Sequence, residues 1–309
     1  MYKIETLLLI AVAGLAAQLV DGGLGMGFGA TSTTILIALA GLGPAQASAV
    51  VHTAELGTTL ASGLSHWRFG NVDWRIVLAL GVPGAVGAFG GAWGLSQLST
   101  AAARPWTALV LVAIGANLAW RFSRDRRSAV RTGREYRRGF LGGLGLFGGF
   151  IDASGGGGWG PVTTATLLSV GRSEPRRVVG TVNTAEFLVT AAAVAGFGLG
   201  LWDDLVANAA AVGALLVGGV IAAPIAAWLV TRTNPAALGG VVGTLLVVLN
   251  LPAALSLVGV THPGAIAAVR CCALIVGAGL AWRGMRRSRR RIRVVESTSP
   301  DARVARQAA

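Results

Sequence analysis

The chain has 309 residues, of which 53% are hydrophobic and 13% are charged, and its formal net charge is +13. Soluble domains carry about 25% charged residues, so this balance excludes a water-soluble fold, because too little polar surface is present to cover it. The positive charge is concentrated in residues 121–138 and 283–293, which flank apolar segments and contain only two aromatic residues, Phe122 and Tyr136. This distribution argues against nucleic-acid binding and predicts cytoplasmic Arg clusters that attract anionic lipids.

Apolar segments follow one another along nearly the whole chain, several of them long enough to cross a bilayer. Only Lys3 and Glu5 are charged among the first twenty residues, so no cleaved signal peptide is expected. The tail, 284–309, is Arg-rich and then polar, and we expect it to be disordered. The expected segments are 4–20, 28–42, 46–65, 75–96, 105–122, 139–152, 159–171, 177–199, 205–230, 236–256 and 264–283.

The chain aligns with itself without a gap at an offset of 131 residues. Residues 21–61 pair with residues 152–192, with thirteen identities over forty-one positions. The duplication divides the chain into a first membrane repeat, an Arg-rich cytoplasmic linker, a second membrane repeat, one extra transmembrane helix and the tail. The corresponding bounds are 1–122, 123–138, 139–260, 261–283 and 284–309.

Loop charges predict that the two repeats face opposite ways in the membrane. The loop 41–47 has no charge, whereas its counterpart 172–177 holds three Arg; the loop 66–75 has two Arg, whereas its counterpart 200–204 has two Asp and no base. Basic and non-basic loops therefore exchange between the copies, as an inverted-topology repeat requires. We predict an all-α polytopic membrane protein in which each half is a Gly-tipped helical hairpin plus three transmembrane helices, with a cytoplasmic C-terminus and an outside N-terminus.

Matching Gly-rich runs, each after an Asp, form the expected hairpin tips. Glycine permits close approach of a ligand to the backbone, and the free N–H groups of the helix that follows favour an anion. The alternative is that these glycines only allow tight helix crossing. The candidate substrate-binding residues are Gly25, Gly27, Phe28, Gly29 and Thr33 in the first copy, and Gly156, Gly158, Trp159, Gly160 and Thr164 in the second.

Glu55 and Glu186 occupy the same position of an apolar helix in the two copies. A carboxyl group at membrane depth is a functional candidate, and removal from water favours its protonated form. We therefore assign proton coupling to Glu55 and Glu186, with His52 at i−3 of Glu55 as a relay partner. A structural role, in which a protonated Glu hydrogen-bonds an unwound tip, is equally open.

Asp21 and Asp152 lie where the first helix of each hairpin ends, and we expect them to cap the returning helix. Asn183, the counterpart of His52, is grouped with them as structural. Direct participation of both Asp in transport, or in a cation site formed with both Glu, is the alternative. Arg270 is the only base well inside an apolar segment, and either pairing with a carboxylate, attraction of an anion or snorkelling fits its position.

The runs 25–29 (GMGFG) and 156–160 (GGGWG), with an apolar-helix Thr-Ala-Glu later in each half, resemble the TauE/SafE family of sulfite exporter-type permeases. The resemblance extends over about residues 5–283, and Trp159 departs from the Phe that the family has at this position. It implies an inner-membrane permease for sulfite, sulfonates or related small organic anions.

Together these features predict a secondary transporter for a small anion, coupled to protons, in the cytoplasmic membrane. The expected partners are the anionic substrate, protons and anionic lipids, and a homodimer is compatible with the sequence. No nucleophile–base pair, metal motif or cofactor motif is present, so we expect neither an enzyme nor a bound cofactor or metal. A passive anion channel, a cation/proton antiporter and a membrane enzyme acting on a lipid are the alternatives.

Overall fold

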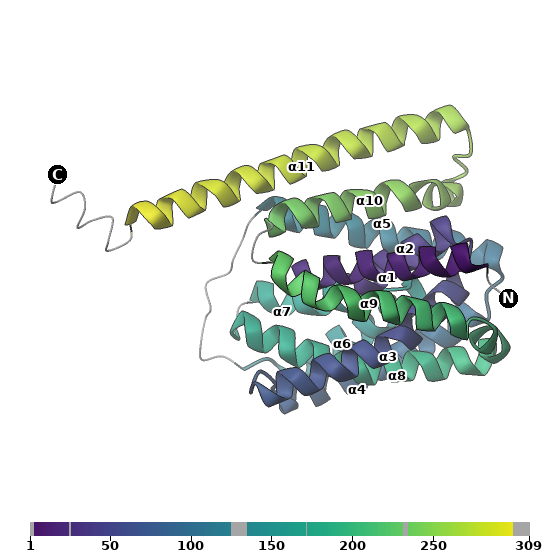
Figure 1. Cartoon of the computed structure of the whole chain (residues 1–309), viewed down its shortest axis with the longest axis horizontal. Coiled ribbons are helices and arrows are strands. Elements are labelled where there is room, and N and C mark those ends of the chain that lie inside the picture. The colour runs from purple at the N-terminus through teal and green to yellow at the C-terminus, as the bar shows by residue number, and fades with distance from the viewer. Residues whose placement is uncertain (1–2, 25, 125–134, 171, 231–233, 299–309) are drawn as a thin grey trace.

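The computed structural model describes residues 3–24, 26–124, 135–170, 172–230 and 234–298, and helices make up nearly all of this part of the chain (Figure 1). In chain order the elements are α1 (Ile4–Leu24), α2 (Phe28–Leu39), α3 (Pro44–Arg68), α4 (Trp74–Ser96), α5 (Thr100–Arg124), α6 (Arg138–Gly155), the π-helical turn η1 (Gly160–Thr164), α7 (Ala165–Val170), α8 (Pro175–Ala207), α9 (Ala209–Val230), α10 (Pro235–Leu255), the short 3₁₀ helix η2 (Ser256–Val258) and α11 (Pro263–Thr298).

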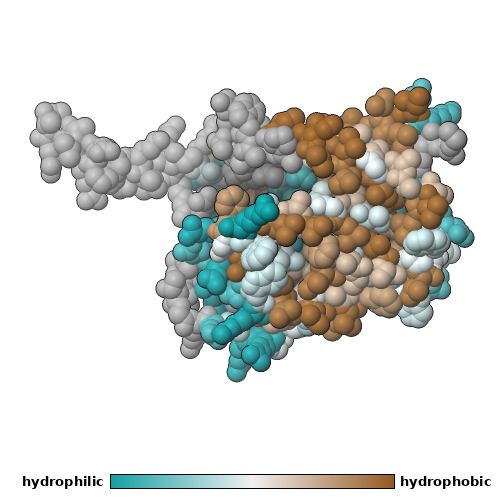
Figure 2. All heavy atoms as spheres, turned by 60° about the horizontal axis from the view of Figure 1, so that its bottom comes forward, coloured by the Kyte–Doolittle hydropathy of each residue, from teal (hydrophilic) through white to brown (hydrophobic). Residues whose placement is uncertain are grey.

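Six of the described helices are long and apolar enough to cross a membrane, and they lie in α1, α4, α5, α8, α10 and α11. Large apolar side chains stand exposed along these helices. Figure 2 shows them as a band of apolar surface between two more polar ends. A bilayer is the solvent that such a band requires, so the predicted class, an all-α polytopic membrane protein, is confirmed.

The helices that follow the Gly-rich tips are too short to cross a bilayer. α2 has 12 residues, and η1 and α7 have five and six; at 1.5 Å per residue each returning arm is about 18 Å long, against a hydrocarbon core of about 30 Å. Arg138 and Arg172, at the two ends of the second hairpin, line the same pocket, so that hairpin enters and leaves at one end of the bundle. The N-terminus lies at the opposite end (Figure 1).

The first helix of each hairpin packs on the other repeat. α1 lies along α9, and its counterpart α6 lies along α4. Both contacts depend on a glycine at the same repeat position, because a Cβ added to Gly14 would lie 2.2 Å from the Leu215 carbonyl oxygen, and one added to Gly145 would lie 2.0 Å from that of Leu80. This exchange of partners supports the predicted inverted repeat, whose orientation in a bilayer stays a prediction.

The structure differs from the expected segments in two places. Residues 200–204, an expected loop, continue α8 with a kink at Leu201 (φ −135°, ψ 30°). The tail was expected to be disordered from residue 284, but α11 continues to Thr298. Between Gly284 and Pro300 no residue breaks a helix, and arginine is a good helix former. Residues 125–134 of the linker and 299–309 of the tail lie outside the described residues.

Arg270 has a structural partner in the neighbouring helix. Pro252 lies inside α10 and has no N–H to donate to the carbonyl of Val248 one turn earlier. The Nε of Arg270, on α11, donates to that carbonyl at 3.0 Å. The arginine therefore satisfies a backbone acceptor that the proline leaves free, rather than pairing with a carboxylate.

Candidate functional site

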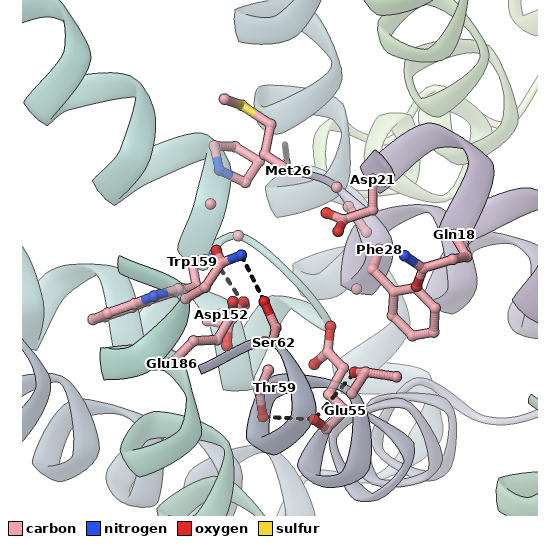
Figure 3. Close-up of a pocket in the computed structure, with 18 residues that line it drawn as sticks. Gln18, Asp21, Met26, Phe28, Glu55, Thr59, Ser62, Asp152, Trp159 and Glu186 are labelled. Atoms are coloured by element: carbon pink, nitrogen blue, oxygen red, sulfur yellow. Dashed lines mark hydrogen bonds between the residues drawn. The ribbon is translucent and has the colours of Figure 1, made fainter. Parts of the chain in front are cut away.

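Residues of both repeats surround one cavity of about 100 Å³ in the centre of the bundle. Pockets for drug-sized ligands measure roughly 300–1,000 Å³, so this cavity suits a very small solute. Its lining includes matched residues from the two copies (Figure 3). These matched pairs are Asp21 and Asp152, Gly27 and Gly158, Phe28 and Trp159, Gly29 and Gly160, Ala30 and Pro161, and Glu55 and Glu186.

Each Asp holds the start of the arm that returns from its tip. Asp152 Oδ1 accepts a hydrogen bond from the backbone N–H of Trp159 at 2.8 Å. The carboxyl group of Asp21, its counterpart, interacts with the backbone N–H of Phe28. A helix leaves its first N–H groups without internal acceptors. Each Asp supplies an acceptor for one of these N–H groups, which lies seven residues further along the chain. The next residues of α2, Gly29 and Ala30, lie in its first turn and line the cavity.

His52 of α3 bonds to the second hairpin. Its Nε2 lies 3.1 Å from Asp152 Oδ2, and its ring is fully buried. Its Nδ1 lies 2.8 Å from the Ser48 carbonyl oxygen, which can only accept, so Nδ1 carries a hydrogen. The Ser48 hydroxyl donates to the Ala153 carbonyl at 2.9 Å, so it has no hydrogen left for the ring. His52 thus lies behind the cavity wall, held by both α3 and α6.

Glu55 and Glu186 line the cavity without a fixed partner. Among the described residues neither carboxyl group makes a hydrogen bond, in contrast to Asp152. Glu55 is only 5% exposed, and a Cβ added to Gly29 would lie 3.2 Å from its Oε1, so this carboxyl group lies against the first turn of α2. A buried carboxyl group with no bound donor can take up or release a proton without breaking an existing contact.

The two tips touch where they meet. A Cβ added to Gly29 would lie 2.9 Å from the Gly157 Cα, and one added to Gly157 would lie 2.1 Å from the Ala30 nitrogen. Gly157 also has φ +138°, a conformation that other residues rarely adopt. Gly160 packs against Met26 in the same manner, because its added Cβ would lie 2.8 Å from the Met26 Cβ. The glycines therefore serve close backbone contact between tips as well as access to the cavity.

Several residues predicted to bind substrate lie behind the tips. The Thr33 hydroxyl donates to the Gly156 carbonyl and so joins α2 to the other tip. Gly156 packs against the Thr33 side chain rather than against the cavity. Thr164 is 1% exposed and is not part of the cavity lining. Gly25 lies outside the described residues.

The indole of Trp159 points away from the cavity, as Figure 3 shows. It is fully buried, its Nε1 donates to the Val182 carbonyl at 3.1 Å, and the ring lies against Gly84 and Gly148 of neighbouring helices. Trp159, predicted to bind substrate, therefore lines the cavity with its backbone, and its ring fastens the tip to α8 one turn before Glu186.

Sequence reasoning missed polar residues that complete the cavity. Gln18 lies one turn before Asp21, and Ser62 lies two turns after Glu55. The Asn183 side chain donates to the Ser62 hydroxyl at 3.2 Å. Helical spacing from the acidic residues could have found both Gln18 and Ser62.

The lining of the cavity carries four carboxyl groups and no Lys or Arg. In Figure 3, Asp21 on one side and Asp152 and Glu186 on the other direct their carboxyl groups toward the space between them. Among the described residues no three acidic, His or Cys side chains come together as a metal site would require. The cavity therefore offers backbone N–H groups and titratable carboxyls, and the charge of these carboxyls decides which ions it accepts.

Comparison with known proteins agrees with this geometry. The family model described as sulfite exporter TauE/SafE matches residues 10–253. The chain is 47% identical, over 248 residues, to the probable membrane transporter protein YtnM of Bacillus subtilis (strain 168), covering 80% of this chain and 82% of the relative. No solved structure matches the chain. With two Gly-tipped hairpins meeting at a small acidic cavity and a family match over most of its length, the chain belongs to the TauE/SafE family of membrane transporters.

Proposed function

We propose that this protein is a secondary transporter that moves a small anion, such as sulfite or a sulfonate, across the cytoplasmic membrane together with protons. The observation that carries the proposal is the composition of the central cavity: backbone N–H groups of the tips beside four carboxyl groups, with no basic side chain in the lining.

The N–H groups supply the binding element for an anion. Gly29 and Ala30 lie in the first turn of α2 and line the cavity, where the positive end of the helix dipole favours negative charge. The volume of about 100 Å³ leaves room for a few atoms. Sulfite fits this size more readily than a long sulfonate.

The carboxyl groups make binding depend on protons. In a site with a low dielectric constant, two like charges a few ångströms apart repel by several kcal/mol. An anion can therefore enter this cavity only when most of the carboxyl groups are neutral, so each anion that binds brings protons with it. Glu55 and Glu186 are the first candidates, because their carboxyl groups make no hydrogen bond within the described part of the chain.

The direct test is uptake by proteoliposomes of labelled sulfite, taurine and sulfoacetate under an imposed pH gradient. We expect one of these anions to accumulate, and a protonophore to abolish the accumulation. Anion flux that only equilibrates, with no response to the pH gradient, would instead indicate a passive channel.

The four carboxyl groups also make a cation/proton antiporter the second candidate. The same proteoliposomes separate the two functions, because an antiporter would move protons when Na⁺ or K⁺ is added without any anion substrate. Cation-driven proton flux with no anion accumulation would replace the proposed function with the antiporter.

A further inference from the structure

We propose that the Arg-rich end of the bundle holds a binding site for one anionic phospholipid, with its phosphate in an arginine-lined pocket and an acyl chain in the seam between α4 and α6. The site is separate from the central cavity, and the inference does not depend on what the protein transports.

The pocket of about 1,210 Å³ lies where α4, α6 and α8 all begin. Five arginines and three carboxylates line it, so its side chains carry an excess of two positive charges. Three helix N-termini add their positive dipole ends to this charge. The arginines are Arg75, Arg138, Arg172, Arg176 and Arg177.

Two of the arginines are available for a ligand. Arg177 pairs with Asp73 at 3.0 Å, and Arg176 pairs with Glu174 at 2.8 Å. Arg75 and Arg138 have no ion-pair partner among the described residues. They lie at the first turns of α4 and α6, so both guanidinium groups can bind one phosphate.

Further along the two helices from the pocket, the seam between α4 and α6 is open and apolar. The exposed side chains Leu78, Val82 and Val86 follow one face of α4 at intervals of four residues. On α6, Gly139 and Gly143 leave open space, because an added Cβ would meet nothing within 4 Å. A groove of about 440 Å³ continues this seam.

The groove is apolar and has the right length for a lipid tail. Gly90 on α4, with Leu146, Phe147 and Phe150 on α6, is part of its lining. From Leu78 to Gly90 the seam runs about 18 Å along the helix, close to the roughly 15 Å depth of one leaflet of hydrocarbon. A soluble phosphate would use the pocket alone, whereas a phospholipid uses both parts, and this continuity favours the lipid.

The corresponding loop of the other repeat has no arginines. The loop that corresponds to residues 66–75 is 200–204, which holds two Asp and no Arg. The duplication therefore kept the helix packing in both copies but placed the five clustered arginines at one end only, as a ligand specific to one leaflet requires.

The test is lipid binding by the full-length protein in detergent, followed by native mass spectrometry with added phosphatidylglycerol or phosphatidylcholine. We expect one retained phosphatidylglycerol per chain and little phosphatidylcholine. R75Q/R138Q is expected to weaken phosphatidylglycerol binding about 30-fold, from two lost arginine contacts to an anionic lipid. R286Q/R287Q, which removes two exposed arginines of α11 outside the pocket, is the matched control and should bind as the wild type does.

A second pair of variants tests the acyl-chain seam. Gly90→Leu fills the groove, whereas Gly94→Leu, one turn further along α4, lies outside its lining; at both positions an added Cβ meets nothing within 4 Å, so both variants should fold. We expect only G90L to weaken phosphatidylglycerol binding. Equal binding by all variants would overturn the site. Loss in R75Q/R138Q with G90L unaffected, and competition by soluble glycerophosphoglycerol, would show a phosphate-ester site and overturn the lipid assignment.

Discussion

His52 Nε2 and Asp152 Oδ2 lie 3.1 Å apart and belong to different repeats. Since Nδ1 of His52 already donates to the Ser48 carbonyl, a hydrogen bond between the two side chains requires one further proton between Nε2 and Oδ2. The pair therefore shares one proton next to the cavity. Asp152 also accepts the hydrogen bond from Trp159, so this pair is connected to the arm that returns from the second tip.

Replacing Asp152 with Asn tests the role of this proton without removing the structural contacts of residue 152. The amide oxygen of Asn can still accept from the Trp159 N–H, and the amide nitrogen can donate to His52 Nε2, so both contacts persist without the titratable carboxyl group. We expect D152N to insert normally and to lose most of its pH-driven anion accumulation in proteoliposomes. Asp21→Asn, at the corresponding position but without a histidine, is the matched comparison and should lose less. Equal losses in both variants would assign the effect to charge in the cavity rather than to the His52 pair.

Glu55→Gln and Glu186→Gln should each abolish proton-coupled accumulation while leaving the protein folded. Neither carboxyl group makes a hydrogen bond within the described residues, so the amide replaces no existing contact. Initial rates of labelled anion uptake with and without a pH gradient measure the effect, for which we expect a loss of about tenfold or more, about 1.4 kcal/mol in the coupled step. Asp203→Asn, an exposed carboxyl group of α8 that lines neither the central cavity nor the arginine-rich pocket, is the control. Full gradient-driven uptake by both cavity mutants would remove them from the coupling mechanism.

Gly157→Ala should destabilise the protein strongly. The residue has φ +138°, and an added Cβ would lie 2.1 Å from the Ala30 nitrogen. Gly41→Ala isolates the first effect, because Gly41 has φ +70° but open space around it. We expect about 1–3 kcal/mol from backbone conformation in each variant, and an additional loss from the clash in G157A alone. Thermal unfolding in detergent compares the two, and equal stability would show that the tips are not in contact.

Arg270→Leu should destabilise the packing of α11 on α10 by about 1–3 kcal/mol, because the Val248 carbonyl then lacks a donor in an apolar environment. Pro252→Ala in the R270L background restores a backbone N–H one turn away and should recover much of this loss. Thermal unfolding of the four members of this cycle gives the coupling energy. Additive effects would mean that the arginine does not compensate for the proline.

The sequence could predict the tips and the acidic residues because the duplication marks them twice. Helical spacing suggested Glu55 as the partner of His52 in a proton relay, and that relay stays a prediction. The residue that His52 contacts is Asp152, 100 positions away in the other repeat. Short-range spacing holds no information about such a contact between helices. The orientation of the Trp159 ring, away from the cavity, has the same origin, since Gly84 and Gly148 of neighbouring helices provide the space for it.

Arg270 shows the same limit for a single residue. Its position inside an apolar segment is visible in the sequence, but its role depends on α11 lying beside the turn of α10 that contains Pro252. The helical tail was within reach of the sequence, because helix propensity alone favours it over the disorder that its charge suggests.

The packing of α1 on α9 has a consequence for how the protein is made. Gly14 of α1 contacts the Leu215 carbonyl of α9, so α1 leaves the ribosome about 200 residues ahead of its partner. At about 5–20 residues per second, this interval lasts on the order of 10–40 s. Throughout it α1 lies in the membrane without its main partner. Neither half of the duplication can therefore assemble by itself, and an N-terminal fragment ending in the linker would leave the first hairpin open to quality-control proteases.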